Sequence, residues 1–295
     1  MHETHLSDAD CVWPAGAILG EGPIWSPTHR SLYWVDIKAP ALHRYGIDDG
    51  ARESWPMPER IGFAVERANG KGFVVGLKST GFATLDLPNS IQPIGQPEPD
   101  RPGNRCNDAT ADATGRLWAG TMDDNETEAS GWLYRLEADG QWSRQDGPYV
   151  VTNGPAINPG QSTLYHTDSL NRTIYAFDLH ADGSLTNKRV FVRLGDDEGF
   201  PDGMTVDTEG GVWVAHFGAG RVTRFDPDGR PERVIHLPVN QITSCCFAGD
   251  DLDRLYITTA AVGLDRAALK EQPLAGGLFV AVPGMRGLPT ARFGG

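Results

Sequence analysis

The chain has 295 residues and a formal net charge of −13, which disfavours nucleic acids and anionic membrane surfaces as partners. Hydrophobic residues make up 39% of the sequence, too many for a disordered chain and enough for a large core. No segment approaches the about 20 apolar residues of a membrane span, and residues 1–10 lack the apolar centre of a signal peptide. We therefore expect a cytoplasmic protein without nucleic-acid or membrane partners.

Glycine and proline are abundant, with 36 and 21 residues, a composition typical of many short strands joined by tight turns. The four cysteines, Cys11, Cys106, Cys245 and Cys246, follow no zinc-binding or CxxC spacing. We expect all four to be reduced and to serve mainly in packing.

Short apolar runs that predict β-strands recur along the whole chain, each after a turn signal. In chain order they cover residues 32–35, 72–75, 116–119, 163–166, 211–214 and 254–257. Their second residues are separated by 40, 44, 47, 48 and 43 residues. Because a four-stranded propeller blade needs about 40–50 residues, the spacing predicts an all-β, six-bladed β-propeller that forms a single domain over residues 1–295.

The turns between the runs agree with this architecture. Residues 113–115, 159–161 and 208–210 predict tight hairpins that join the innermost strand of a blade to the second strand. Two Rossmann-like domains are the competing fold, but no amphipathic helices separate the strands, and only residues 265–270 could form a helical turn. We expect the ring to close by pairing of residues 11–13 with the last blade, which includes residues 277–280.

An equivalent position lies 10–12 residues before the second residue of each run. It is occupied by Glu21, Ile61, Asn107, Asn153, Asp202 and Ser244. The innermost strands of a propeller line its central channel, so these side chains should meet at one end of the axis. Four of the six carry hard oxygen donors, which predicts one divalent-metal site for calcium, zinc, manganese, magnesium or ferrous iron.

Glycine directly follows Glu21, Asn153 and Asp202. Asn-Gly and Asp-Gly are also common hairpin-turn dipeptides, which is the competing interpretation of any one of them. Their matching positions in different blades favour the metal site. Carboxylates that converge on one channel repel each other, and a bound dication removes that cost.

The same segments resemble the gluconolactonase family, which includes regucalcin (senescence marker protein 30) and the luciferin-regenerating enzymes. The similar motifs span nearly the whole chain, at residues 19–23, 34–37, 104–108, 119–122, 153–155, 201–204, 243–247 and 275–277. Residues 73–78, 165–168 and 173–179 are similar to bacterial sugar lactonases such as xylonolactonases.

The resemblance implies a sugar lactonase in which Glu21, Asn153 and Asp202 bind the metal ion and Arg105 and Asn107 contact the substrate. In parts of the family an acidic residue soon after the Gly-Thr-Met motif also contacts substrate. Asn125 stands there in this chain, so we expect residues 123–126 to form a solvated acidic loop.

The leading hypothesis is a metal-dependent hydrolase that opens an aldonolactone, a pentonolactone or hexonolactone such as xylonolactone, arabinonolactone or gluconolactone, to the aldonic acid. Asp202 would act as the general base, and Arg105 would orient the sugar or stabilise the oxyanion. The alternatives are a calcium-binding regulatory propeller without essential catalysis and a hydrolase of another ester or an organophosphate. A serine triad is disfavoured because the sequence has no GxSxG motif, and His166 and His216 are expected to be packing residues.

Overall fold

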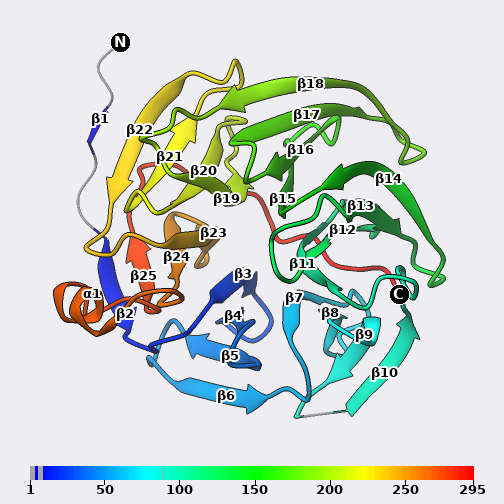
Figure 1. Ribbon diagram of the computed structural model, residues 1–295, viewed down its shortest axis with the longest axis horizontal. Coiled ribbons are helices and arrows are strands. Elements are labelled where there is room, and N and C mark those ends of the chain that lie inside the picture. Colours follow the sequence, from blue (N-terminus) through cyan, green and yellow to red (C-terminus); the bar gives the residue numbers. More distant parts are fainter. Residues whose placement is uncertain (1–3, 6–8, 89) are drawn as a thin grey trace.

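Six sheets surround a central axis in the computed structural model, which describes residues 4–5, 9–88 and 90–295 (Figure 1). Each sheet is built on four antiparallel strands, and the innermost strand of every sheet contacts the innermost strands on both sides. The innermost strands are β3 (Gly20–Ser26), β7 (Ile61–Glu66), β11 (Asn104–Ala111), β15 (Thr152–Ile157), β19 (Phe200–Val206) and β23 (Ile242–Ala248). The predicted six-bladed propeller is confirmed.

The apolar runs used to find the repeat form the second strand of each blade. These strands are β4 (Ser31–Asp36), β8 (Phe73–Leu77), β12 (Leu117–Asp123), β16 (Thr163–Asp168), β20 (Val212–Phe217) and β24 (Arg254–Thr259). Neighbouring blades cover both faces of a second strand, so β4, β8 and β12 are buried at every residue. This burial on both faces explains why the runs are continuously apolar.

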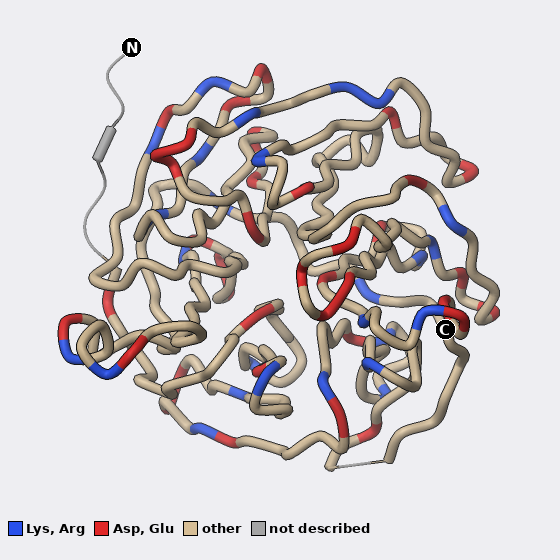
Figure 2. The backbone as a smooth tube through the Cα atoms, viewed as in Figure 1, with Lys and Arg blue, Asp and Glu red and all other residues tan. Residues whose placement is uncertain are grey.

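The outer strands complete the blades. The third strands are β5 (Ala41–Gly46), β9 (Gly81–Asp86), β13 (Gly131–Leu136), β17 (Thr173–Leu179), β21 (Arg221–Phe225) and β25 (Leu278–Ala281). The outermost strands are β6 (Arg52–Pro56), β10 (Ser90–Gly95), β14 (Trp142–Tyr149), β18 (Leu185–Arg193), β22 (Pro231–His236) and β2 (Asp10–Trp13). Lys, Arg, Asp and Glu are spread around this periphery, and a few acidic positions border the central space (Figure 2).

The ring closes as expected. Strand β2 from the start of the chain pairs antiparallel with β25, and Cys11 lies opposite Phe279. The short strand β1 (Thr4–His5) pairs parallel with the outer edge of β22. All four cysteines are free, as expected.

Helical structure is confined to one short element in the described part of the chain. Helix α1 (Arg266–Glu271) begins after Asp265, whose carboxylate accepts hydrogen bonds from the backbone N–H groups of Ala267 (2.9 Å) and Ala268 (2.8 Å). Helix α1 is shifted by one residue toward the C-terminus from the helical turn predicted at residues 265–270. No described helix has both the length and the apolar content needed to cross a membrane.

Buried aspartates fix the hairpins between first and second strands. At the turn after β11, the Gly115 N–H donates to the carbonyl of Asp112 (3.0 Å), whose carboxylate accepts from Trp118 Nε1 (3.1 Å). In the equivalent hairpin after β19, Trp213 Nε1 donates to Asp207 (2.8 Å). Each aspartate therefore ties its turn to a fully buried tryptophan of the second strand.

Every innermost strand is irregular at the same level of the channel. Its pairing with the second strand shifts register between Glu21/Ile24, Ile61/Phe63, Cys106/Ala109, Asn153/Ala156, Pro201/Met204 and Ile242/Ser244. Such a bulge bends the strand and re-aims its side chains. The irregularities coincide with the equivalent positions that the sequence identifies as the candidate site.

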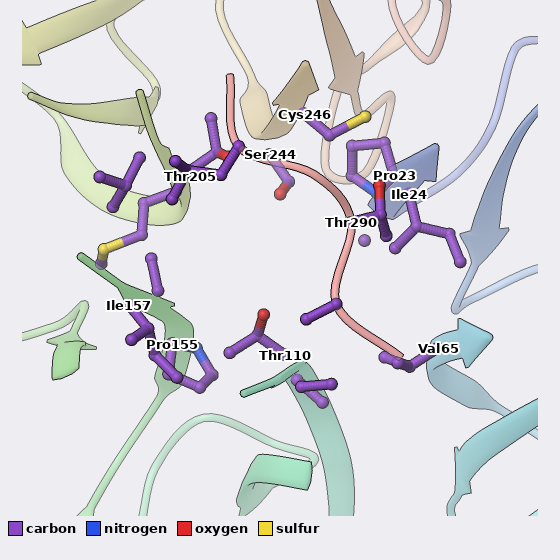
Figure 3. Close-up of a pocket in the computed structure, with 18 of the residues that line it drawn as sticks. Pro23, Ile24, Val65, Thr110, Pro155, Ile157, Thr205, Ser244, Cys246 and Thr290 are labelled. Atoms are coloured by element: carbon purple, nitrogen blue, oxygen red, sulfur yellow. The ribbon is translucent and has the colours of Figure 1, made fainter. Parts of the chain in front are cut away.

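The other end of the channel is crossed by the C-terminal strap, which we define as residues 282–295 (Figures 1 and 3). Thr208 N–H donates to Arg286 O (2.9 Å), and Phe293 N–H donates to Glu66 O (2.8 Å), so the strap joins blades on opposite sides of the ring. An axial cavity of about 170 Å³ lies against the strap. It is lined by the innermost strands and by strap residues such as Thr290 (Figure 3).

Candidate functional site

A pocket of about 210 Å³ lies at the end of the axis where the innermost strands begin. All five residues predicted for the site line it: Glu21, Arg105, Asn107, Asn153 and Asp202. Much of the remaining wall is apolar and includes Leu19, Met122, Val151, Leu170, Phe200 and Val262. The geometry therefore combines a few buried polar groups with an apolar wall, as is typical of small-molecule sites.

Two carboxylates from different blades dominate the electrostatics. Glu21 and Asp202 are only 5% and 7% exposed. Burial raises the pKa of Glu21 to about 7, although the Gly22 N–H (2.9 Å) and the charge of Arg105 oppose the shift. Burial, followed by the negative charges of Glu21 and Asp108, raises the pKa of Asp202 well above its usual range. A cation placed between these carboxylates would relieve the desolvation and the repulsion.

The carboxamide of Asn153 is held in a defined orientation. Its Nδ2 donates to Ser169 Oγ (2.9 Å), and its Oδ1 accepts from Asn107 Nδ2 (2.8 Å). Asn107 Nδ2 also donates to the carbonyl of Thr152 (2.6 Å). These contacts fix which atom of Asn153 is the oxygen, and that oxygen keeps a lone pair for a further partner.

The donor set fits a hard divalent cation. Asp202 Oδ1 is buried and has no hydrogen-bond partner, as expected of an atom placed to bind an ion. Within the residues that the structure describes, no three acidic, histidine or cysteine side chains are grouped so as to hold a metal. The residues that would hold a cation here are Glu21, Asp202 and Asn153, whose carboxylate and amide oxygens are all hard donors.

Arg105 is a buried cation beside these groups. It is 4% exposed, and its Nε donates to Asp124 (3.0 Å) while its Nη1 donates to Asn107 Oδ1 and to the carbonyl of Cys106 (3.1 Å). Burial lowers the pKa of Arg105, and the charges of Asp124 and Glu126 oppose that shift. The guanidinium is therefore held at the pocket wall by three acceptors.

The two remaining equivalent positions do not join this pocket. Ile61 is fully buried in the apolar core between the first two blades, and Ser244 lines the axial cavity instead. His166 and His216 are also fully buried and are not part of the pocket wall. Burial lowers the pKa of His166 to about 3 and of His216 to about 4, so both stay neutral.

Four further charged residues belong to the surroundings of the site. Lys38 and Glu126 line the pocket, and Asp124 holds Arg105. Asp108 lines the axial cavity, where burial and the charge of Glu21 raise its pKa well above its usual range. The acidic run after the Gly-Thr-Met motif could have signalled Asp124 and Glu126, whereas no sequence feature distinguishes Lys38.

The loop after β12 differs from the expectation of a purely solvated segment. Asp123 is buried, and although Asn125 and Glu126 are both exposed, Glu126 also lines the pocket and has a φ of 60°. This left-handed conformation is unusual for a residue other than glycine and carries a cost that its surroundings have to offset. The loop therefore contributes to the pocket through Glu126.

The fold and the site define a six-bladed propeller protein with buried carboxylates and carboxamides gathered at one end of its axis. A family model described as the SMP-30/gluconolactonase/LRE-like region matches residues 19–261. The chain belongs to this family, as the resemblance of its motifs implies.

Named relatives match almost the whole chain. L-arabinolactonase of Azospirillum brasilense is 39% identical over 281 residues, which cover 94% of this chain and 92% of that protein. Regucalcin of Danio rerio is 37% identical over 292 residues, with 97% and 98% covered. A crystal structure described as a calcium-binding protein, regucalcin, from Agrobacterium tumefaciens superposes with a TM-score of 0.93 at 25% identity, and 99% of each chain is covered. Lactonases are hydrolases of carboxylic esters, so the expected enzyme class agrees with the first of these names.

Proposed function

We propose that this protein is a metal-dependent lactonase that hydrolyses an aldonolactone, a pentonolactone or a hexonolactone, to the aldonic acid. The observation that carries the proposal is the meeting of Glu21, Asn153 and Asp202 in one small pocket beside the buried Arg105. The name of the arabinolactonase relative supports the substrate class.

A divalent cation held by Glu21, Asn153 and Asp202 would supply Lewis acidity and would lower the pKa of water. Hydrolysis adds water to the lactone carbonyl, breaks the bond from the carbonyl carbon to the ring oxygen, and leaves that oxygen as a hydroxyl group. The Asp202 carboxylate would accept the proton of the attacking water. Arg105 would donate to the oxygen that becomes negative, and Asn107 would bind a sugar hydroxyl through the second lone pair of Oδ1.

A calcium-binding regulatory protein without essential catalysis is the second candidate. The relatives named regucalcin and the calcium-binding structural neighbour favour it. Against it, the pocket holds an arginine and an asparagine beside the carboxylates and has a largely apolar wall, which a calcium buffer does not need.

Proton release separates the two candidates, because each lactone that opens yields a carboxylic acid. We expect purified protein to acidify solutions of arabinonolactone, xylonolactone or gluconolactone above the spontaneous rate, to lose this activity with a chelator, and to regain it when Ca²⁺, Mn²⁺, Mg²⁺, Zn²⁺ or Fe²⁺ is restored. Activity that resists complete metal removal would contradict the metal-dependent mechanism. Metal binding without hydrolysis of any lactone would favour the regulatory protein.

The substitution Asp202→Asn tests the general base. It keeps one ligating oxygen but removes the proton acceptor, so we expect kcat to fall by about 10²–10⁴-fold. Metal content, measured by elemental analysis, and folding, measured by circular dichroism, should be recorded with the rate. A variant that retains both the metal and full activity would rule out this role for Asp202.

A further inference from the structure

Asp124 is the acceptor for three cations that come from three places in the chain. Its Oδ1 accepts from Arg105 Nε (3.0 Å), and its Oδ2 accepts from Lys78 Nζ (2.6 Å) and from Arg60 Nη1. The Asp124 side chain is 7% exposed, whereas those of Arg60 and Lys78 are 35% and 32% exposed. One buried carboxylate thus joins a pocket-lining arginine of β11 to two residues at the ends of β7 and β8.

These contacts keep Asp124 ionised. Burial by itself raises the pKa of the Asp124 carboxyl, but the hydrogen bonds from Lys78 and Arg60 and the charge of Arg105 outweigh it and lower the pKa to about 2. Charge-assisted hydrogen bonds of this kind are shorter and stronger than neutral ones. The Asp124 carboxylate is therefore ionised at neutral pH, where it can pair with the Arg105 guanidinium.

A continuous chain of hydrogen bonds leads from this anchor to the proposed metal ligand. Asp124 fixes Arg105, Arg105 Nη1 donates to Asn107 Oδ1, and Asn107 Nδ2 then donates to Asn153 Oδ1 (2.8 Å). Because Arg105 has only donors, it requires the oxygen of Asn107 to face it. The amide nitrogen of Asn107 consequently faces Asn153, and the two carboxamides keep one relative orientation.

The loop conformation itself depends on a different residue. Asp123 accepts hydrogen bonds from the backbone N–H groups of Asn125 (3.2 Å), Thr127 (3.0 Å) and Glu128 (3.1 Å). The Asp124 side chain makes none of these bonds, so shaping the loop and holding Arg105 are separate tasks.

We propose that Asp124 is the positioning residue of the site. It holds Arg105 against the pocket wall and, through Asn107, sets the orientation of the Asn153 carboxamide toward the bound cation. The catalytic part of this inference rests on the proposed lactonase function, whereas the part concerning cation binding does not.

The test uses Asp124→Glu, which keeps the charge but moves it by one methylene, together with Asp124→Asn, which removes the charge. Asp146→Asn is the matched control, since Asp146 binds Lys188 Nζ at the same 2.6 Å but lies in the outer strand β14. For each protein kcat and KM on the best lactone, Mn²⁺ affinity of the chelator-stripped protein by calorimetry, and folding by circular dichroism are measured. The Nε–H resonance of Arg105, assigned by its loss in Arg105→Lys, reports the anchor directly.

We expect both Asp124 variants to lower kcat or Mn²⁺ affinity by about 10–100-fold. Losses of this size are usual when a residue that orients the metal ligands through hydrogen bonds is replaced. The change in kcat should exceed the change in KM, and the Arg105 resonance should broaden, while Asp146→Asn matches the wild type. If Asp124→Asn does not fold, Asp124→Glu decides alone. A folded Asp124→Glu protein with wild-type kcat, Mn²⁺ affinity and Arg105 resonance would overturn the proposal. If the wild type hydrolyses no lactone, the lactonase function fails, but the Mn²⁺ titrations and the resonance still decide the role of Asp124.

Discussion

At the scale of single residues, burial of a carboxyl group in the site makes the stability of the folded protein depend on pH. The Glu21 carboxyl has a pKa of about 7 in the folded protein, well above its ordinary value in an unfolded chain. Between about pH 4 and 7 the Glu21 carboxyl is therefore more protonated in the folded state than in the unfolded state, and the contribution of Glu21 to stability falls as the pH rises through this window. Burial of the Glu21 carboxyl is the main cause of this raised pKa.

The raised pKa of Glu21 leads to a prediction for the protein from which a chelator has removed all metal ions. Relative to the variant Glu21→Gln, its melting temperature should fall by several degrees more between pH 5 and pH 7.5, and saturating Mn²⁺ or Ca²⁺ should remove most of this extra fall by binding the ionised carboxylates. Differential scanning fluorimetry with and without metal measures both effects. The variant Glu21→Gln lacks the titrating carboxyl and keeps the buried histidines, so it is the reference for this comparison. A stripped wild-type protein whose melting temperature responds to pH as that of Glu21→Gln does would contradict the assignment.

At the scale of the strands, the site depends on how closely the innermost strands approach each other. A Cβ atom added at Gly62 of β7 would lie 2.4 Å from the carbonyl oxygen of Cys106 and 2.6 Å from that of Asn107, both in β11. Backbone atoms cannot yield as a flexible side chain would. Glycine at this position therefore allows blade two to pack directly against the strand that carries Arg105 and Asn107.

We expect Gly62→Ala to separate β7 from β11, to cost about 1–3 kcal/mol as an overpacked site, and to lower kcat at temperatures where the protein remains folded. Gly160→Ala is the control, because its added Cβ would come no closer than 3.5 Å to Ser162 Oγ. Urea unfolding measures the stability difference, and steady-state kinetics measures the effect on the site. If the two variants had equal free energies of unfolding, β7 would be able to move away from β11 without loss of stability, and the prediction would be wrong.

At the scale of the whole molecule, the two ends of the channel serve different purposes. The pocket lies where the innermost strands begin, and the C-terminal strap covers the end where they meet their hairpin turns. The strap buries Phe293, which is 1% exposed, and its Arg292 forms an ion pair with Glu66 (Nε to Oε2, 3.2 Å). Closure of the ring and attachment of the strap therefore involve residues that lie outside the pocket with the candidate site.

Deletion of residues 288–295 should lower stability without removing the site. Loss of a buried phenylalanine costs about 3–5 kcal/mol in known cores, and the axial cavity would open to solvent. We expect a clear fall in melting temperature, with kcat near the wild-type value at temperatures well below the new transition. Phe293→Ala should reproduce part of the loss. A truncated protein with an unchanged melting temperature would show that the strap does not stabilise the ring.

The sequence by itself determined the repeat, the blade number and the residues that gather at the axis. The spacing of apolar runs is set by the size of a blade, and a residue such as Asn153 occupies the same place in its blade as Asp202 does in the next, so counting along the chain predicts that they meet. The register shifts of the innermost strands were not visible in this count, because a bulge depends on the pairing partner.

Only the tertiary structure decided which charges complete the site. Lys38 and Glu126 reach the pocket because loops of separate blades converge there, whereas Asp124 reaches Arg105 because β12 pairs with β11 in the same blade. Ile61 and Ser244, which share the repeat position of the site residues, face the core and the axial cavity instead. Position along a repeat fixes where a backbone lies, but the packing of neighbouring blades fixes where each side chain points and which partners it finds.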